Sequence, residues 1–442
     1  MRLQQIYIVL KRSILLLLLI ISATYLKAQF LMDMVDTTKE TGRGLLAVYK
    51  KFDHLRIGGY IQPQFQVAGS KGIRSFEGGD FSAQVNNRFM FRRSRVRIDY
   101  VHFGKETKPG VQIVFQFDAN ERAFTVRDVW GRIFENKYQL FSFTIGMFAR
   151  PFGYEVNLSS GDRETPERGR MSQILMKSER DLGAMLSMDS RRSGSKLKYL
   201  RADIGVFNGQ GINAAGDFDN TKDIIGNIAL KPFPITDQVT LSGGASVLYG
   251  GLLQNTKYVY STGEVSGIKK EIIDSSVDNI HKTSPRHYYG ANAQFKYKSQ
   301  KGLSTELRAE FLAGKQTGTN NNSETPVALM AGNDGFHIRN FNGAYFYLLQ
   351  QVFNTKNQLM LKFDWYDPNS SVSRNEIGAP GSNFTASNIR YSTIGFGYIN
   401  YLTENVKIVL YYARVFNEKT QLPGFTGDVK DDVFTCRLQF RF

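Results

Sequence analysis

The chain has 442 residues, of which 13% are aromatic, with a formal net charge of +16 and one cysteine, Cys436. A single cysteine excludes a fold held together by internal disulfides. The length fits either two or three soluble domains or one large barrel, and the basic excess suits nucleic acid, acidic lipid or anionic solutes as partners.

The first 28 residues have the pattern of a secretory signal peptide. Basic residues precede an uncharged apolar run over 14–21, and small residues follow it up to Ala28. The run is too short to cross a bilayer as a helix. We therefore expect residues 1–28 to direct export and residues 29–55 to form a short N-terminal periplasmic extension. Export makes nucleic acid the least fitting partner, and we expect none.

From residue 56 onward, apolar and polar residues alternate in short segments. For example, Val111, Ile113 and Phe115 alternate with Gln112 and Gln116. A period of two indicates strands with one apolar and one polar face. No later apolar stretch is long enough for a transmembrane helix, so a membrane-spanning form requires strands that close into a barrel. Sixteen segments are candidate strands: 56–67, 88–103, 110–118, 123–134, 138–148, 181–189, 197–207, 223–231, 238–250, 286–298, 303–314, 338–352, 357–367, 388–402, 405–417 and 431–442.

The lengths of the connectors also alternate. Short connectors join segments 2 to 3, 4 to 5 and so on, and most of the others are long, with only the connector near Asn120 breaking the rule. Short periplasmic turns and long external loops are typical of outer-membrane barrels. The fold prediction is therefore all-β: a transmembrane antiparallel β-barrel of about 16 strands over residues 56–442, in contact with outer-membrane lipid.

The last segment, 431–442, shows the two faces clearly. Phe434, Cys436, Leu438, Phe440 and Phe442 alternate with Thr435, Arg437, Gln439 and Arg441. We expect the first set to face lipid and the second set to face a wet lumen. The terminal Phe on an alternating strand also resembles the C-terminal signal of bacterial outer-membrane barrels.

The densest basic cluster lies on the segment 88–103. Arg93, Arg95 and Arg97 share one face, and arginine facing lipid at mid-depth would cost about 2–4 kcal/mol, so this face is predicted to line the lumen. Arg92 has the opposite parity, which places it above the bilayer or at a bulge. The guanidinium group stays charged and suits contact with phosphate or carboxylate. The alternative is a wall cluster balanced by acids such as Asp99 and Asp128.

A second, mixed-charge cluster occupies residues 149–180, between the fifth and sixth segments. Six basic residues there oppose five acidic ones, which gives a net charge of only +1. In sixteen-stranded porins such a loop folds into the lumen and narrows it. The alternative is a solvated external loop.

Several motifs together resemble the phosphate-selective porin O and P family. They are the RRSRVRIDY strand, the GMFARPFGYE stretch starting at Gly146 with a later Ser-Ser pair, the RDLGA turn starting at Arg180, and FNG starting at Phe207, in this order. The resemblance covers about residues 57–442. It implies a sixteen-stranded, trimeric porin with an arginine-lined constriction, and it assigns anion contact to Arg92, Arg93 and Arg95. Two features depart from the family pattern: Arg150 lies where lysine is common, and Glu306 and Glu310 add acid to the lumen wall.

We therefore expect a passive porin of the Gram-negative outer membrane, leaning toward anions such as phosphate, and a homotrimer. The candidate anion-contacting and pore-lining residues are Arg92, Arg93, Arg95, Arg97, Arg150, Arg163, Arg168, Arg170, Lys177 and Arg180.

Other site types find little support in the sequence. The five histidines lack metal-ligand spacing, so we expect no metal site and no cofactor. No Ser/His/Asp arrangement indicates catalysis, and we expect no enzyme. Three alternatives stay open: a structural or adhesive barrel that binds a surface partner through its long loops, a barrel enzyme, and a channel for acidic sugars or other organic anions.

Overall fold

The computed structural model describes residues 54–103, 108–332 and 334–442. The predicted signal peptide lies outside the described residues, as does the predicted extension except for its last two positions. Within the described part of the chain, no helix is long and apolar enough to cross a membrane.

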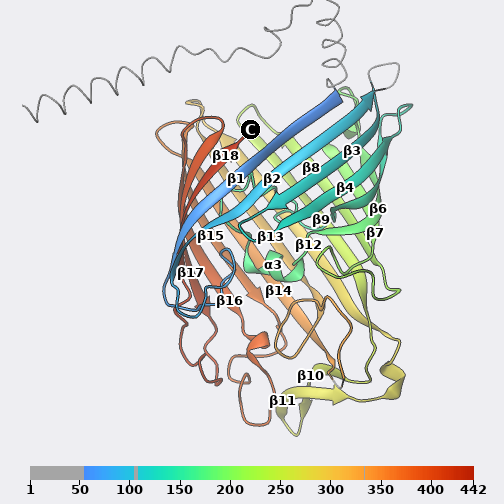
Figure 1. Ribbon diagram of the computed structural model, residues 1–442, viewed down its shortest axis with the longest axis vertical. Helices are drawn as coiled ribbons and strands as arrows, with labels where there is room; N and C mark the ends of the chain where they lie inside the picture. Colours follow the sequence, from blue (N-terminus) through green and yellow to red (C-terminus); the bar gives the residue numbers. More distant parts are fainter. Residues whose placement is uncertain (1–53, 104–107, 333) are drawn as a thin grey trace, which may run out of the picture. The chain divides into compact units, whose positions relative to one another are not determined.

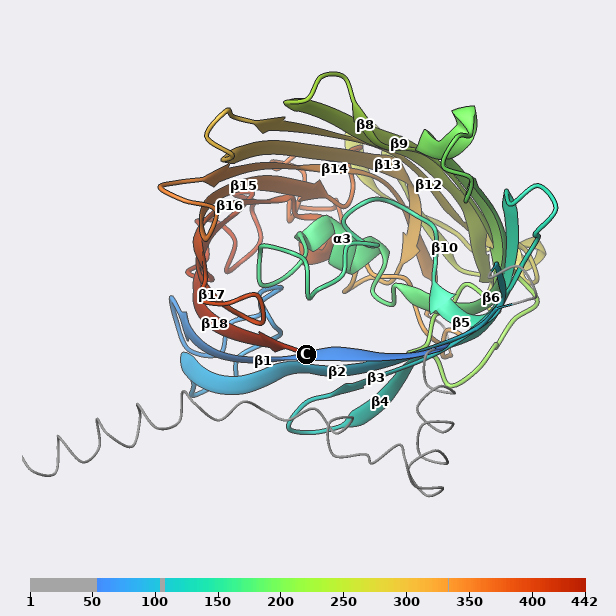
Figure 2. The same ribbon diagram turned by 90° about the horizontal axis from the view of Figure 1, so that it is seen from above.

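The described residues form one sheet, and its antiparallel wall strands close into a barrel (Figures 1 and 2). Strands β1 and β18 close the wall, with Phe65 opposite Cys436, and β9 pairs with β12. Sixteen of the eighteen strands in the described ranges belong to this wall, which confirms the predicted fold class. The wall strands are β1 (Leu55–Ala68), β2 (Asn87–Phe103), β3 (Pro109–Ala119), β4 (Phe124–Phe134), β5 (Phe141–Ala149), β6 (Arg180–Asp189), β7 (Leu200–Phe207), β8 (Asp223–Pro234), β9 (Val239–Leu253), β12 (Thr283–Lys298), β13 (Ser304–Gly318), β14 (Phe336–Gln351), β15 (Asn357–Asp367), β16 (Tyr391–Tyr401), β17 (Val406–Asn417) and β18 (Val433–Arg441).

The alternation in the sequence corresponds to the two sides of the wall. On β5, Phe143 and Ile145 are exposed on the outside, whereas Ser142 and Thr144 are buried on the inside. On β18, Phe434 is exposed and Arg437 is fully buried inside, as the parity predicted. The outer face is therefore apolar and the lumen face polar, which is the distribution that a lipid-facing barrel requires.

Short and long connectors lie at opposite ends of the barrel (Figure 1). The exception predicted near Asn120 is confirmed: residues 120–123 form a tight turn in which the Asn120 side chain accepts hydrogen bonds from the backbone N–H groups of Arg122 and Ala123. One connector contains structure that the sequence reading missed. Strands β10 (Val259–Val265) and β11 (Ile268–Asp274) form a hairpin in the long connector after β9. Ser266 and Gly267 both have positive φ at its turn, as a two-residue hairpin of this kind requires.

The loop between β5 and β6, residues 150–179, folds into the barrel and carries the short helix α3 (Arg170–Leu175) (Figure 2). Its apolar side chains, among them Phe152 and Met171, join a buried cluster with wall residues such as Tyr288 and Phe341. A Cβ atom at Gly343 would lie 2.7 Å from the Met171 sulfur, so glycine on β14 permits the close approach. The loop is therefore a lumen loop, and the solvated external alternative is wrong.

Candidate functional site

The arginine-rich strand β2 changes phase between Arg92 and Arg93. Before this point the odd-numbered Phe89 and Phe91 face outward, and after it the even-numbered Val96 and Tyr100 do. Two consecutive arginines therefore point into the lumen. Such a phase change is what a β-bulge produces, and it accounts for the parity of Arg92.

Both arginines bind the same carboxylate on the lumen loop, that of Glu167. Arg92 donates from Nε to Oε1 (2.8 Å) and from Nη2 to Oε2 (3.1 Å). Arg93 donates from Nη1 to Oε1 (3.0 Å) and from Nη2 to Oε2 (2.7 Å). Arg437 of β18 adds a third contact, from Nη2 to Oε1 at 2.9 Å. Burial of Glu167 opposes its ionisation, but the charges of Arg92, Arg93 and Arg437 outweigh burial and hold the pKa of this carboxyl well below its usual range. We call this group the Glu167 cage.

A second carboxylate on the same loop, Glu179, also lies among three arginines. Arg180 is 2.8 Å from it, Arg168 is 3.4 Å away, and Arg127 of β4 donates a hydrogen bond to it. Burial opposes ionisation here too, and Arg168, Arg127 and Arg180 in that order outweigh it, so the pKa of Glu179 lies well below its usual range. This group, the Glu179 cage, joins the loop to the start of β6 and to the neighbouring wall.

Two ion pairs on the wall adjoin the Glu179 cage, one through Asp118, which lies 3.5 Å from Arg127, and one through Arg180. Arg95 of β2 lies 2.9 Å from Asp118 and donates a 2.8 Å hydrogen bond to Ser160 of the lumen loop. Arg180 lies 3.0 Å from Asp128 of β4. The resulting constriction network links the wall and the loop. It contains seven arginines and four carboxylates, a net charge of +3: Arg92, Arg93, Arg95, Arg127, Arg168, Arg180, Arg437, Asp118, Asp128, Glu167 and Glu179.

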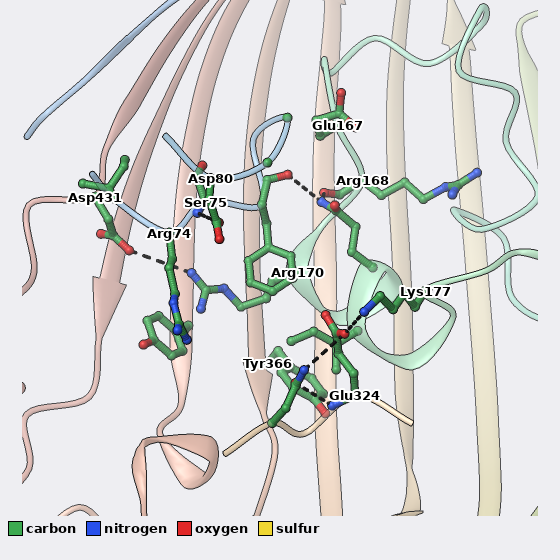
Figure 3. Close-up of a pocket in the computed structure, with 18 of the residues that line it drawn as sticks. Arg74, Ser75, Asp80, Glu167, Arg168, Arg170, Lys177, Glu324, Tyr366 and Asp431 are labelled. Carbon is green, nitrogen blue, oxygen red and sulfur yellow. Dashed lines mark hydrogen bonds and ion pairs between the residues drawn. The ribbon is translucent and has the colours of Figure 1, made fainter. Parts of the chain in front are cut away.

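The network borders a large cavity of about 1160 Å³ (Figure 3). The cavity walls come from the connector 69–86, strands β2, β3 and β4, the lumen loop, Tyr366 of β15, Tyr391 of β16, and the long connectors before β14, β16 and β18. Nine basic and six acidic side chains line it, a net charge of +3: Lys71, Arg74, Arg92, Arg93, Arg95, Arg127, Arg168, Arg170, Lys177, Asp80, Asp118, Glu167, Glu179, Glu324 and Asp431.

Six of the ten predicted site residues therefore line this cavity: Arg92, Arg93, Arg95, Arg168, Arg170 and Lys177. Two of the six contact the walls of the cavity away from the cages. Arg170 lies between the rings of Phe76 and Tyr391, with its guanidinium carbon 4.6 and 3.5 Å from their centroids, and 3.9 Å from Asp431. Lys177 pairs with Glu324 (Figure 3).

The structure places the other four predicted residues outside the cavity lining. Arg180 lies just behind it in the Glu179 cage. Arg97 forms a two-pronged ion pair with Asp99 further along β2, at 2.7 and 2.8 Å, and is 40% exposed. Arg163 is buried and donates to the carbonyl oxygens of Thr165 and Pro166. Burial, aided by Arg168 and Arg93, lowers its pKa to about 10.

Arg150 belongs to a buried structural cluster at the base of the loop. It donates to the carbonyl oxygen of Ser178 and lies 3.6 Å from Asp223. Arg286 of β12 holds the same carboxylate with contacts of 2.6 and 2.7 Å. A Cβ atom at Gly250 would fall within 1.8 Å of Asp223, so this packing also requires glycine. Arg150 therefore fixes the chain where the loop begins.

Sequence reasoning missed Arg127 and Arg437 as site residues. The pairing of β3 with β4 shifts register at Gln116 and Phe117, so that Arg127 and Asp128 both contact lumen groups. This shift has no clear signal in the sequence. Arg437, by contrast, has the parity of the lumen face, and that signal could have identified it.

The opposite side of the lumen loop is fixed by different contacts. The carboxylate of Glu310 on β13 accepts the backbone N–H groups of Tyr154 (2.6 Å) and Glu155 (3.0 Å). Glu155 in turn accepts hydrogen bonds from Ser172 (2.6 Å) and Tyr347 (2.9 Å). The acid that the sequence placed on this wall therefore holds the loop.

No family model matches the chain, and no curated protein matches it. Solved structures do. OprB of Pseudomonas putida is 9% identical, with a TM-score of 0.59 over 91% of this chain and 96% of that chain. An anion-selective porin from Comamonas acidovorans is 11% identical (TM-score 0.51, 88% and 99%), and the outer-membrane channel DcaP of Acinetobacter baumannii is 10% identical (0.50, 88% and 97%). At these identities the likeness concerns the fold, and this chain shares the barrel fold of outer-membrane porins.

Proposed function

We propose that the protein is a passive diffusion porin of the Gram-negative outer membrane that favours anions, phosphate among them. The observation that carries the proposal is the excess of arginine over carboxylate in the constriction network, at the floor of a cavity that is itself net positive. A cluster of like charge in a low-dielectric cleft raises the local concentration of counter-ions.

The passage lies between the lumen loop and strands β2 to β4. On the far side, the loop packs apolar side chains against the wall, and Glu310 holds the loop backbone. On the near side, arginine side chains offer charge-assisted hydrogen bonds that replace part of the hydration of an anion. The neighbouring carboxylates keep these contacts weak enough for the anion to leave, which conduction requires.

Other parts of the proposal rest on the sequence, on the outer face of the barrel and on a protein with the same fold. The signal pattern of residues 1–28 supports export, and the apolar outer face supports contact with outer-membrane lipid. The resemblance to the phosphate-selective porin O and P family supports a homotrimer and anion contact at Arg92, Arg93 and Arg95. The anion-selective porin with the same fold supports the same direction of charge preference.

The test is the reversal potential of the folded protein in a planar bilayer under a salt gradient. We expect an anion preference that falls when Arg93, Arg95 and Arg97 are all changed to alanine. An unchanged preference would contradict the role of these three arginines. Absence of any conductance in the wild-type protein would favour the structural or adhesive barrel instead.

A further inference from the structure

The Glu167 cage holds its carboxylate as a binding site holds a ligand. Five N–H donors from three arginines converge on two oxygens, and Arg92 and Arg93 each span both of them. A carboxylate offers about four lone-pair directions, so the cage saturates it. A single structural ion pair would need one arginine. Three arginines form a complete recognition site for a carboxylate.

The geometry fits a planar carboxylate better than a phosphate. Two guanidinium forks that each span both oxygens match the flat, two-oxygen shape of a carboxylate. A tetrahedral phosphate has further oxygens that need donors of their own. The Gln64 Oε1 atom and the Pro166 carbonyl oxygen next to the cage are acceptors, and both already bind Arg437, at 2.8 and 2.6 Å.

The Glu167 cage also keeps a net positive charge, and part of it can be reached from the cavity. One carboxylate neutralises one of three guanidinium groups, so the cage keeps a net charge of +2 with Glu167 in place. Arg92 and Arg93 line the cavity together with Glu167, and Arg92 is partly exposed there. An anion that reaches the floor of the cavity therefore meets the donors before it meets the Glu167 side chain.

We propose that Arg92, Arg93 and Arg437 form the carboxylate-recognition site of the channel, and that Glu167 is a tethered carboxylate that occupies it between passages. A small organic carboxylate displaces Glu167, is held by the same forks, and leaves when Glu167 returns. This inference rests on the proposed porin function and names organic carboxylates as its preferred solutes.

The experiment compares Glu167→Ala with Glu167→Gln. Glu167→Ala removes an acetate-sized group and opens the cage, whereas Glu167→Gln removes the charge but keeps the space filled. We measure the acetate and phosphate concentrations that halve the chloride current in planar bilayers. The acetate concentration that halves the current should fall about tenfold in Glu167→Ala, equivalent to about 1.4 kcal/mol. It should fall much less in Glu167→Gln. The corresponding phosphate concentration should change less than the acetate concentration.

Two controls keep the result interpretable. Asp217→Asn removes a carboxylate that pairs with Lys222 in the connector 208–222, outside the cavity lining, and should leave both values unchanged. Arg92→Gln keeps Glu167 and should raise the acetate value, so a folding failure of one variant does not end the test. Titration calorimetry of acetate into the detergent-folded Glu167→Ala protein measures the same site without conductance.

Equal gains for acetate and phosphate in both Glu167 variants would overturn the inference, because the cage would then sense charge alone. The inference would also be overturned if Glu167→Ala still conducts and prefers anions but its half-blocking acetate concentration is unchanged, or if calorimetry detects no acetate binding to it. A wild-type protein that does not conduct, or that does not prefer anions, would instead count against the proposed function. In that case calorimetry of acetate binding to Glu167→Ala would still test the carboxylate site.

Discussion

The two sides of the lumen loop differ in how they meet the wall. On one side Phe152, Met171 and their neighbours pack in an apolar cluster with β12 to β15, and Glu310 binds loop backbone. On the other side Glu167 and Glu179 meet β2, β4 and β18 through arginines that border a water-accessible cavity. Small ions do not compete for the apolar contacts, whereas they can exchange with the partners of an ion pair. We therefore infer that the apolar side anchors the loop and that anions pass along the charged side.

The largest expected effect comes from breaking the apolar side. Phe152→Ala should cost about 3–5 kcal/mol of packing free energy, because the ring is fully buried between the loop and Tyr288. The loop should then become susceptible to protease, and the single-channel current should become noisy and larger. Limited proteolysis of the folded protein measures this. A loop that stays protected would show that the ionic side alone holds it.

The second expected effect separates two arginines on one strand. Arg93→Ala removes a contact to Glu167 at the cavity floor, whereas Arg97→Ala removes a pair with Asp99 outside the cavity lining. The loss of anion preference should be clearly larger for Arg93→Ala, because its charge faces the passage. Reversal potentials of the two single variants give the comparison. An equal loss would mean that the whole face of β2 contributes, as the sequence alone suggested.

The sequence predicted the barrel wall well, because the alternation of side chains along each strand determines which of them face lipid and which face the lumen. In β18 the alternation of Phe434 and Thr435 decides which side meets lipid, and no partner is needed to read it. The same rule placed Arg93, Arg95 and Arg97 in the lumen. The rule could not show that Arg150 and Arg163 make internal contacts instead of facing the pore. Arg150 pairs with Asp223, which is distant in the sequence, and Arg163 binds loop carbonyl groups whose positions depend on the loop conformation. The arginines that bind Glu167 come from β2 and β18, which lie on either side of β1 where the barrel closes, and no local sequence pattern specifies this closure.

The third expected effect is a pH dependence of opposite sign in two sets of loop carboxyls. Burial raises the pKa of Glu77 to about 7 and that of Asp431 to about 6, each partly offset by a cation, Lys362 and Arg170 respectively. Both lie above their ordinary values of 4.5 and 3.8, so their contribution to loop docking is complete at low pH and is lost as pH rises through 6 to 7. Glu167 and Glu179 have lowered pKa values, so their contribution is present above about 4.5 and is lost as pH falls below it.

Proteolysis of the connector 69–86 between pH 5 and pH 8 measures the first of these effects. We expect cleavage to increase toward pH 8, and Glu77→Gln to flatten the dependence because the amide does not titrate. Faster cleavage at pH 5 than at pH 8 would contradict the assigned sign.

The smallest expected effect concerns an exposed ion pair. Lys177 pairs with Glu324 near the cavity mouth and is half exposed. Exposed pairs contribute about 0–1 kcal/mol, so Lys177→Gln should leave stability nearly unchanged and reduce anion preference only slightly. Urea unfolding and reversal potential together measure this. A loss as large as that of Arg93→Ala would move the selective region from the constriction network to the mouth.

Cysteine accessibility tests most directly whether ions pass along the charged side of the lumen loop. With the native Cys436 replaced by serine, Arg93→Cys and Tyr345→Cys place one thiol on each side of the loop, and a negatively charged thiosulfonate reagent is added during current recording. We expect a rapid fall in current for Arg93→Cys and no change for Tyr345→Cys. A fall in current for Tyr345→Cys with none for Arg93→Cys would place the passage on the side assigned here to anchoring.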